Sequence, residues 1–137
     1  MIVVVDTNVI VSGLIDPNGV PGLIVAGIVC RDFVLAYDGR ILSEYAEVLR
    51  RTRLGIHADA AEAIIDAALR GGIPAPSAPL PARLPHAADE PFLEIALASG
   101  AECLITGNLA HFPVDLRQGV RVLSPAEFIE YRRRPRD

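Results

Sequence analysis

The sequence contains no lysine. All 13 basic residues of the 137-residue chain are arginine, and 17 acidic residues leave a formal net charge of −4. A Walker-type phosphate loop ends in Gly-Lys-Ser/Thr, and Schiff-base enzymes and Ser-x-x-Lys hydrolases need a lysine amine, so these three classes are excluded. A phosphoacceptor receiver domain is disfavoured for the same reason, because its site normally carries a lysine.

Cysteines and long apolar runs are also scarce. The two cysteines, Cys30 and Cys103, lie far apart in the sequence and cannot form a four-ligand zinc site. We expect both to be small buried side chains in a reducing compartment rather than a disulfide pair. The longest apolar candidate, residues 20–30, falls short of the roughly 18 residues of a membrane span and contains Pro21. The start MIVVVD lacks the basic region of a secretory signal, so the expected location is the cytoplasm, with no membrane association.

The negative net charge argues against attraction of nucleic acid by the molecule as a whole, but it leaves room for a local basic patch. Two arginine clusters are candidates. Each can equally be a solvated helix end, stabilised by the negative end of the helix dipole. The first cluster contains Arg50, Arg51 and Arg53, and the second contains Arg132, Arg133, Arg134 and Arg136.

Hydrophobic patterning predicts alternating strands and helices. Short apolar runs predict buried strands, and apolar residues three and four positions apart predict amphipathic helices. Strands are expected at 2–5, 33–37, 103–106 and 120–123, with one more in the proline-rich stretch 73–85. Helices are expected at 22–30, 40–53, 59–69, 89–99 and after Ser124, whereas residues 6–8 are expected only to end the first strand. This alternation is typical of an α/β protein, here one domain over residues 1–137, with three α/β/α layers around a central, mainly parallel sheet.

Several residues are expected to begin or end these helices. Asp59 with Glu62 three residues later has the spacing of a capping box, as does Ser124 with Glu127. Gly100 suits the position just after a helix.

Four side chains with hard oxygen atoms are expected to meet at one edge of the sheet. Ligands of an open parallel sheet bind beyond the carboxyl ends of its strands. Any one acid there can be a helix cap, but clustered carboxylates repel one another unless a cation lies among them. Mg²⁺ prefers such oxygen ligands and supports phosphodiester hydrolysis. The four residues are Asp6 after the first strand, Glu44 in the helix after the second, Asp89 at the start of the helix 89–99, and Asn108 after the strand 103–106.

Motifs along nearly the whole chain resemble the PIN domain family, in its VapC-like branch of toxins from bacterial toxin–antitoxin systems. They are IVVVDTNVIVSGL at 2–14, SEYAEVL at 43–49, DEPFLEIALASGAECLITGN at 89–108 and HFP at 111–113. The proline-rich segment and the last few residues carry no motif of this kind. The order and spacing of the four motifs make the resemblance more specific than the Asp-Thr-Asn triplet alone.

The resemblance implies an acidic triad of Asp6, Glu44 and Asp89 that holds Mg²⁺ or Mn²⁺, with Asn108 at the family's fourth position. His111 stands where many relatives carry a further acid, so this site has less negative charge than the fullest version of the family site. The imidazole can ligate the metal, contact RNA or simply pack. Hydrogen bonds from neighbouring polar side chains are expected to orient Asp6. These neighbours are Thr7 and Asn8, although Asn8 can equally satisfy a turn, whereas Thr106 can hold a water or the metal, or simply end its strand.

The activity implied by the resemblance is endonucleolytic cleavage of single-stranded RNA by water that the metal activates. Candidate RNA contacts are Arg50, Arg51, Arg53 and His111. A cognate antitoxin protein is expected to cover the acidic edge. A homodimer can use apolar helix faces near Ile24, Ile28 and Leu49, although core packing explains these residues equally well.

Two other functions remain as alternatives. The fold can serve as a non-catalytic binding or regulatory module with a weakened metal site, which the missing acid at position 111 favours. A haloacid-dehalogenase-like phosphatase also begins with a strand that ends in aspartate, but it needs Asp-x-Asp, and Asn8 stands at the third position. Glu90 and Glu94 are expected to be solvated charges on the surface of their helix.

Overall fold

The centre of the fold is a five-stranded sheet in which every neighbouring pair of strands is parallel. The computed structural model describes residues 1–134, so Arg136 lies outside the described residues. The strand order is β3-β2-β1-β4-β5, and β1 pairs with both β2 and β4. The strands are β1 (Ile2–Val5), β2 (Val34–Tyr37), β3 (Ile73–Pro74), β4 (Cys103–Ile105) and β5 (Val122–Leu123).

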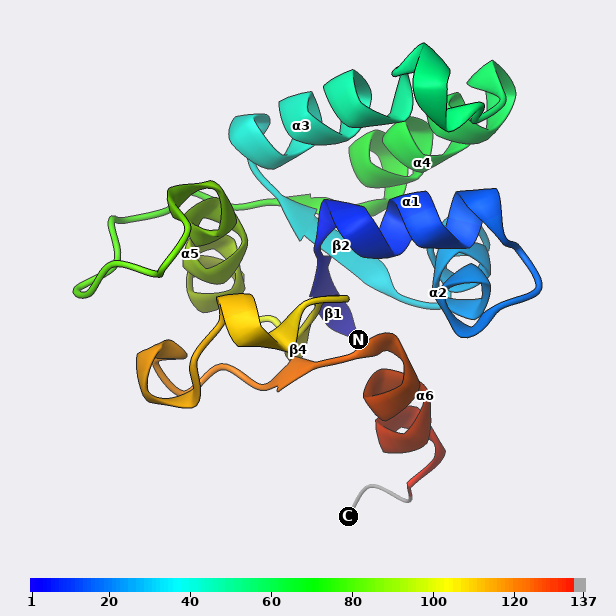
Figure 1. The fold of residues 1–137 in the computed structure, drawn as a ribbon. Helices are drawn as coiled ribbons and strands as arrows, with labels where there is room; N and C mark the ends of the chain where they lie inside the picture. Colours follow the sequence, from blue (N-terminus) through cyan, green and yellow to red (C-terminus); the bar gives the residue numbers. More distant parts are fainter. Residues whose placement is uncertain (135–137) are drawn as a thin grey trace.

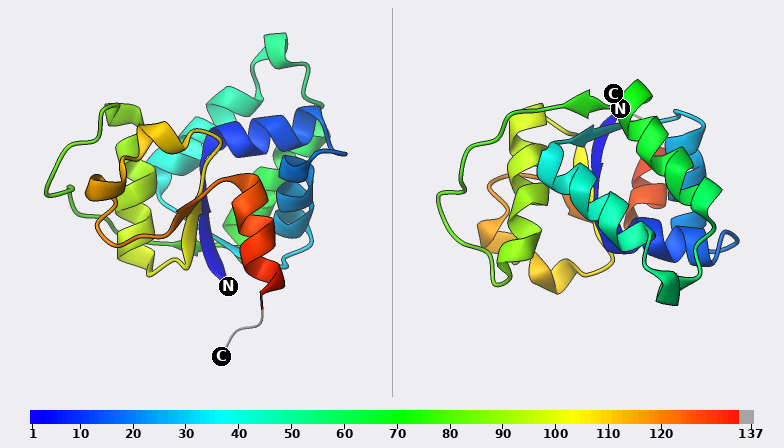
Figure 2. Two further views of the ribbon diagram at one scale, coloured as in Figure 1. Left: turned by 60° about the horizontal axis from the view of Figure 1, so that its bottom comes forward. Right: turned by 90° about the horizontal axis from the view of Figure 1, so that it is seen from above.

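Helices cover both faces of this sheet (Figure 1). One face is covered by α5, which packs against β1, β2 and β4, whereas α2 packs beside α4 and α6 on the other face (Figure 2). The predicted three-layer α/β/α architecture is therefore confirmed. The helices are α1 (Thr7–Ile15), α2 (Val20–Val29), α3 (Gly39–Leu49), α4 (Ala58–Gly71), α5 (Glu90–Ser99) and α6 (Pro125–Arg133).

Helix α1 is the element that the sequence pattern missed. Residues 6–8 do not only end β1 but lead directly into a nine-residue helix. Its β-branched residues Val9 and Ile10 have low helix propensity, but both are buried in the core, and their packing outweighs that preference. Gly13 allows the close approach of α2, because a Cβ atom there would lie 2.6 Å from the carbonyl oxygen of Pro21.

Two expected helix boundaries need correction, and two are confirmed. The helix expected over 40–53 ends at Leu49, and a short 3₁₀ turn, Thr52–Leu54, follows it. The cap of α4 is His57, whose side chain accepts a hydrogen bond from the Asp59 backbone, so the capping box of Asp59 with Glu62 is wrong. The capping box at Ser124 and the left-handed Gly100 after α5 are confirmed.

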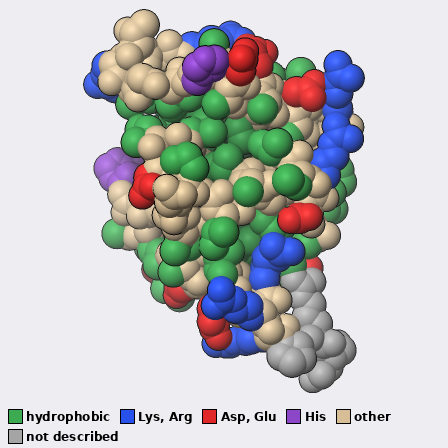
Figure 3. Space-filling model, turned by 90° about the vertical axis from the view of Figure 1, so that its right-hand side faces the viewer, with side chains coloured by type: hydrophobic (Ala, Val, Ile, Leu, Met, Phe, Trp, Pro, Cys, Tyr) green, Lys and Arg blue, Asp and Glu red, His purple; other side chains and the backbone are tan. Residues whose placement is uncertain are grey.

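Burial corrects two further expectations. Cys103 is buried as expected, but Cys30 is exposed. The residues expected near a dimer face belong to the core instead, since they are 0–2% exposed; they are Ile24, Ile28 and Leu49. The large apolar side chains that α1 and α2 do expose are Ile15, Val20, Leu23 and Val29. Figure 3 views the molecule from the side of these two helices and shows hydrophobic atoms across much of the face.

Among residues 1–134, no single helix is both long enough and apolar enough to cross a membrane. Helices α1 and α2 reach that length only together, and the chain bends by 102° between them.

Candidate active site

The order of the strands places a crevice between the ends of β1 and β4. The chain adds β2 and β3 on one side of β1, then returns to add β4 and β5 on the other side. In a doubly wound sheet, the loops after the two central strands separate at this point and leave room for a ligand. Asp6 directly follows β1, and Thr106, Gly107 and Asn108 directly follow β4.

Asp6 is buried at the bottom of this crevice. Its side chain accepts a hydrogen bond of 2.9 Å from the Thr106 hydroxyl, and its backbone N–H donates to the carbonyl oxygen of Ile105. Burial raises the pKa of Asp6 from 3.8 to about 6, against the opposing effect of the Thr106 hydrogen bond. The charges of Asp89 and Glu44 contribute to this rise, so the three predicted carboxylates lie close enough to repel one another.

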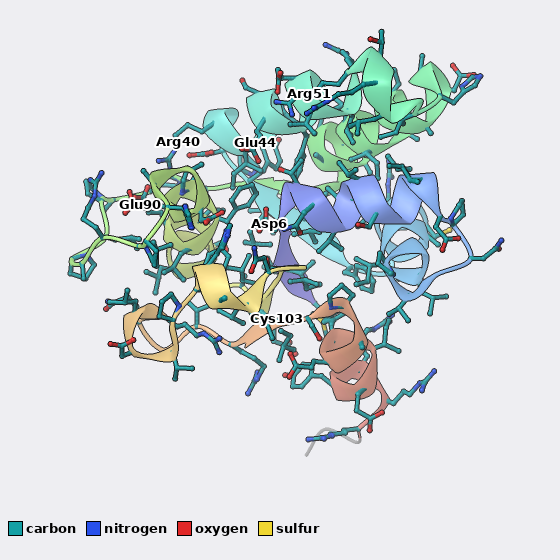
Figure 4. All side chains as sticks on the ribbon, viewed as in Figure 1. Asp6, Arg40, Glu44, Arg51, Glu90 and Cys103 are labelled. Carbon is teal, nitrogen blue, oxygen red and sulfur yellow. The ribbon has the colours of Figure 1, made fainter. Side chains whose placement is uncertain are left out.

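Glu44 reaches the crevice from α3. This helix begins at Asp38, whose side chain accepts a hydrogen bond from the Ile41 backbone. Glu44 Oε2 accepts a hydrogen bond from the Thr7 hydroxyl of α1, which ties the two helices together beside the site. Figure 4 shows Glu44 and Asp6 in the space enclosed by α1, α3 and α5.

Asp89 comes from a third element, the 3₁₀ turn Ala87–Asp89 that leads into α5. Its Oδ2 atom is buried and has no hydrogen-bond partner among the described residues. The polar atom beside it is Nδ1 of His111, at 2.9 Å, which forms an ion pair when the imidazole is protonated. A buried carboxylate oxygen without a hydrogen bond has unused capacity to bind a cation.

The two asparagines serve the loop after β4 in different ways. Asn8 Oδ1 accepts a hydrogen bond of 3.0 Å from the Gly107 backbone, so this side chain mainly holds the loop against α1. Asn8 Nδ2 is also 3.5 Å from Asp6 Oδ2, which is a weak contact at best. The backbone N–H of Asn108 donates to the Thr106 hydroxyl, and this bond places Asn108 at the edge of the crevice.

The chemistry of these side chains fits a hard divalent cation, although they do not enclose one by themselves. Among residues 1–134, no three His, Cys, Asp or Glu side chains are arranged to hold a metal ion. Mg²⁺ sites on enzymes often use only one or two carboxylates, with water and substrate phosphate as the other ligands. The raised pKa of Asp6 and the unpartnered oxygen of Asp89 are features that such a cation would relieve.

The first arginine cluster divides into two parts. Arg51 and Arg53 line a groove of about 450 Å³ between α1 and α3, together with Thr7, Asn8 and Glu44. Arg50 is not among the lining residues and pairs instead with Glu62 of α4, at 2.9 Å. Hydrogen bonds to Glu47, followed by the charge of that residue and of Glu44, raise the pKa of Arg51 above its usual value.

The sequence pattern missed the role of Tyr45 in this site. Tyr45 is fully buried under it and donates its hydroxyl hydrogen to the carbonyl oxygen of Val5, at the end of β1. Burial, with the charges of Asp6 and Glu44, raises the pKa of Tyr45 well above its usual value. The only available signal was the position of Tyr45 on the apolar face of α3, which indicates core packing but not a hydrogen bond.

Glu90 and Glu94 are not solvated, contrary to expectation. Each is less than 10% exposed. Glu94 pairs with Arg40 at 2.8 Å, and Glu90 accepts a hydrogen bond from the Leu84 backbone. These two side chains fasten α5 to α3 and to the proline-rich loop, and so fix the position of Asp89 at the start of α5.

Comparison with models of protein families agrees with this geometry. A model of the PIN domain matches residues 2–110, which include β1, α3, Asp89 and β4. No curated protein and no solved structure matches the chain. The match covers most of the sequence and contains every carboxylate of the crevice, and the chain belongs to the PIN domain family.

Proposed function

We propose that the protein is an endoribonuclease that depends on Mg²⁺ or Mn²⁺ and cleaves single-stranded RNA. PIN domains are nucleases in general, and the specific activity of this chain is the proposal. The observation that carries it is the approach of three carboxylates from three separate elements: burial raises the pKa of Asp6, and the charges of Asp89 and Glu44 add to that rise. Without a bound cation, the repulsion between three such carboxylates destabilises the folded protein.

The proposal gives each residue a specific task. Asp6, Glu44 and Asp89 would hold the cation, with Asn108 assisting from the edge of the crevice. When bound, the cation would offset the negative charge that develops on the phosphate oxygens. Thr106 and Thr7 hold the carboxylates of Asp6 and Glu44 in place through their hydroxyl groups. Arg51 and Arg53 would bind the RNA backbone along the groove beside Glu44.

The test is cleavage of a labelled single-stranded RNA by the purified protein in the presence of Mn²⁺. We expect the wild type to cut the RNA and Asp6→Asn and Asp89→Asn to lose the activity while circular dichroism shows an intact fold. Glu62→Gln is a control, because Glu62 is an exposed carboxylate of α4 that pairs with Arg50, outside the groove. Cleavage that survives both aspartate substitutions would show that the nuclease site lies elsewhere.

The cellular role is a further part of the proposal. The chain would act in the cytoplasm as the toxin of a toxin–antitoxin pair, and its partner would be a small antitoxin that covers the acidic crevice with a basic side chain. The negative charge of Asp6, Glu44 and Asp89 supports a basic partner. Self-association would use the exposed apolar side chains of α1 and α2 and not the buried residues first expected. Co-expression with the adjacent gene, followed by sedimentation analysis, tests both points.

A non-catalytic binding module is the second candidate function. Two observations favour it: position 111 is histidine and not an acid, and no three side chains among residues 1–134 are arranged to hold a metal ion. Calorimetric titration separates the candidates. Binding of Mn²⁺ at micromolar to low millimolar concentration supports the nuclease, and no binding at several millimolar supports the module.

A further inference from the structure

His111 and Asp89 are in an arrangement that the proposed function leaves unexplained. His111 Nδ1 lies 2.9 Å from Asp89 Oδ2, which is short enough for a hydrogen bond, but this oxygen accepts none from any described residue. The oxygen is buried, whereas the imidazole is one-third exposed at the mouth of the crevice. The two atoms are therefore within ion-pair distance, but no hydrogen bond satisfies the buried oxygen.

Such a separation is what two neighbouring ligands of one metal ion require. In octahedral coordination with bonds of about 2.1 Å, adjacent ligand atoms are about 3 Å apart and both direct their lone pairs at the ion. The contact between His111 and Asp89 has this length and lacks hydrogen-bond geometry. The pair would supply two of the ligands, with Asp6, Glu44, water and phosphate as candidates for the others; among residues 1–134, no three such side chains are already arranged to hold a metal ion.

His86 fixes the orientation of the His111 ring. The two ring centroids are 4.2 Å apart, and the rings are inclined by 35°. His86 caps the 3₁₀ turn that ends at Asp89, so one short segment carries both the carboxylate and the ring that steadies the imidazole. His111 itself ends the 3₁₀ turn Leu109–His111 after β4. The pair of potential ligands is thus held from both sides of the crevice.

We propose that His111 Nδ1 and Asp89 Oδ2 are paired ligands of the divalent cation, and that this nitrogen makes the site prefer first-row transition ions to Mg²⁺. The inference rests on the proposed function, because it concerns the same cation. Imidazole nitrogen binds transition ions more strongly than it binds Mg²⁺, whose usual ligands are oxygen atoms. His111 is then a metal ligand in addition to the carboxylates, and His86 is a positioning residue that acts through the ring of His111.

The experiment detects nitrogen at the metal directly and needs no RNA. Metal-free full-length protein is loaded with Mn²⁺, and pulsed electron paramagnetic resonance measures the hyperfine coupling to ¹⁴N. We expect a directly bound nitrogen in the wild type, with the coupling constant changing in the expected ratio when histidine is labelled with ¹⁵N. His111→Phe should abolish the coupling, since phenylalanine keeps a ring against His86 but has no nitrogen.

The three histidines of the chain provide matched controls. His57→Asn removes the imidazole at the cap of α4, far along the chain from the site, but keeps a side-chain acceptor, and it should leave the coupling unchanged. His86→Phe keeps the stacked ring and should also retain the coupling, whereas His86→Ala should broaden it. In calorimetry, His111→Phe should weaken Co²⁺ and Mn²⁺ binding about tenfold or more and affect Mg²⁺ binding much less.

The possible outcomes separate this inference from the function on which it rests. Bound Mn²⁺ without nitrogen coupling in the wild type would overturn the role of His111 and leave the nuclease proposal standing. Coupling that persists in His111→Phe but disappears in His86→Ala would assign the nitrogen to His86 and also overturn the inference. If the wild type binds no Mn²⁺ at several millimolar, the proposed function itself fails.

Discussion

Thr106 donates its hydroxyl hydrogen to Asp6 Oδ2 at 2.9 Å and so joins the ends of two adjacent parallel strands across 100 residues of sequence. The same hydroxyl oxygen accepts a hydrogen bond from the Asn108 backbone. Thr106 is completely buried, so water cannot replace either bond. One hydroxyl group therefore sets both the orientation of Asp6 and the path of the loop that carries Asn108.

Replacement of Thr106 by valine tests this link. Val is close to Thr in shape but leaves the Asn108 N–H without a partner and Asp6 Oδ2 with only its weak contact to Asn8 Nδ2, so the free energy of unfolding should fall by about 1–3 kcal/mol. The Thr106 hydrogen bond lowers the pKa of Asp6, so its loss should raise that pKa further above 6. Urea unfolding and a carboxyl ¹³C titration measure the two effects. Thr106→Ser keeps the hydroxyl and should preserve the pKa; a valine variant with an unchanged pKa would contradict the role given to this bond.

Asp6 should make the stability of the metal-free protein depend on pH. The pKa of Asp6 is about 6 in the folded state and ordinarily 3.8, so between these pH values the folded protein binds a proton that the unfolded chain does not. The stability contributed by protonated Asp6 is fully present below about pH 4 and is lost as the pH rises through 6. The loss amounts to about 3 kcal/mol at most.

The variant Asp6→Asn has no titrating carboxyl group at this position and therefore lacks this loss of stability with rising pH. In the presence of a chelator, it should be more stable than the wild type at pH 7 to 8, and its stability should vary less between pH 4 and 7. Asp59→Asn is the control, because that side chain is 95% exposed and should leave the pH profile of the wild type unchanged. Parallel pH profiles of the wild type and Asp6→Asn would show that burial does not raise the pKa of Asp6.

The parts of this site that depend on strand order could be predicted from the sequence. Asp6 and Asn108 each follow an apolar run, and parallel strands in an open sheet bring such positions to one edge, where the structure places them. Helix α1 could not be predicted in the same way. Val9 and Ile10 favour strands, and only the burial of both side chains against the rest of the fold makes the helix stable.

Contacts between residues far apart in the sequence could not be predicted from the sequence pattern, for a different reason. Glu94 lies one turn after Glu90 on α5, and a charged side chain on a helix is usually solvated. Its partner, Arg40, lies 54 residues earlier, so no local spacing indicates the ion pair. The contact between Asp89 and His111 is hidden in the same way, since it joins residues on either side of α5 and β4.

The groove between α1 and α3 leads to a prediction for substrate binding. Arg51→Ala combined with Arg53→Ala should raise the KM for RNA while changing kcat little, because both side chains line the groove beside Glu44. If each arginine contacts one phosphate, the slope of log affinity against log salt should become shallower by about 1.4 in total. Arg50→Ala is the matched control, since Arg50 pairs with Glu62 of α4 and does not line the groove. An equal effect of Arg50→Ala would indicate a general effect of positive charge rather than RNA binding in this groove.

Arg40 should contribute to stability far more than an ordinary surface arginine. Its guanidinium forms ion pairs with Glu94 and Asp38, at 2.8 and 2.7 Å. It also donates a hydrogen bond to the Ser77 hydroxyl of the proline-rich loop. Arg40→Met leaves the side chain of Glu94, only 10% exposed, without its counter-charge. Because Arg40 itself is about half exposed, the cost should fall between that of a surface pair and a buried pair, about 2 kcal/mol in the free energy of unfolding.

A double-mutant cycle isolates this effect from the loss of packing. Adding Glu94→Gln to Arg40→Met removes the uncompensated charge and should restore part of the stability, since the remaining amide needs no counter-ion. Arg70→Ala is the surface control: Arg70 pairs with Asp66 one turn away, both side chains are more than half exposed, and the expected loss is below about 0.5 kcal/mol. If Arg40→Met were as mild as Arg70→Ala, the buried charge of Glu94 would not be what fastens α5, and with it Asp89, to α3.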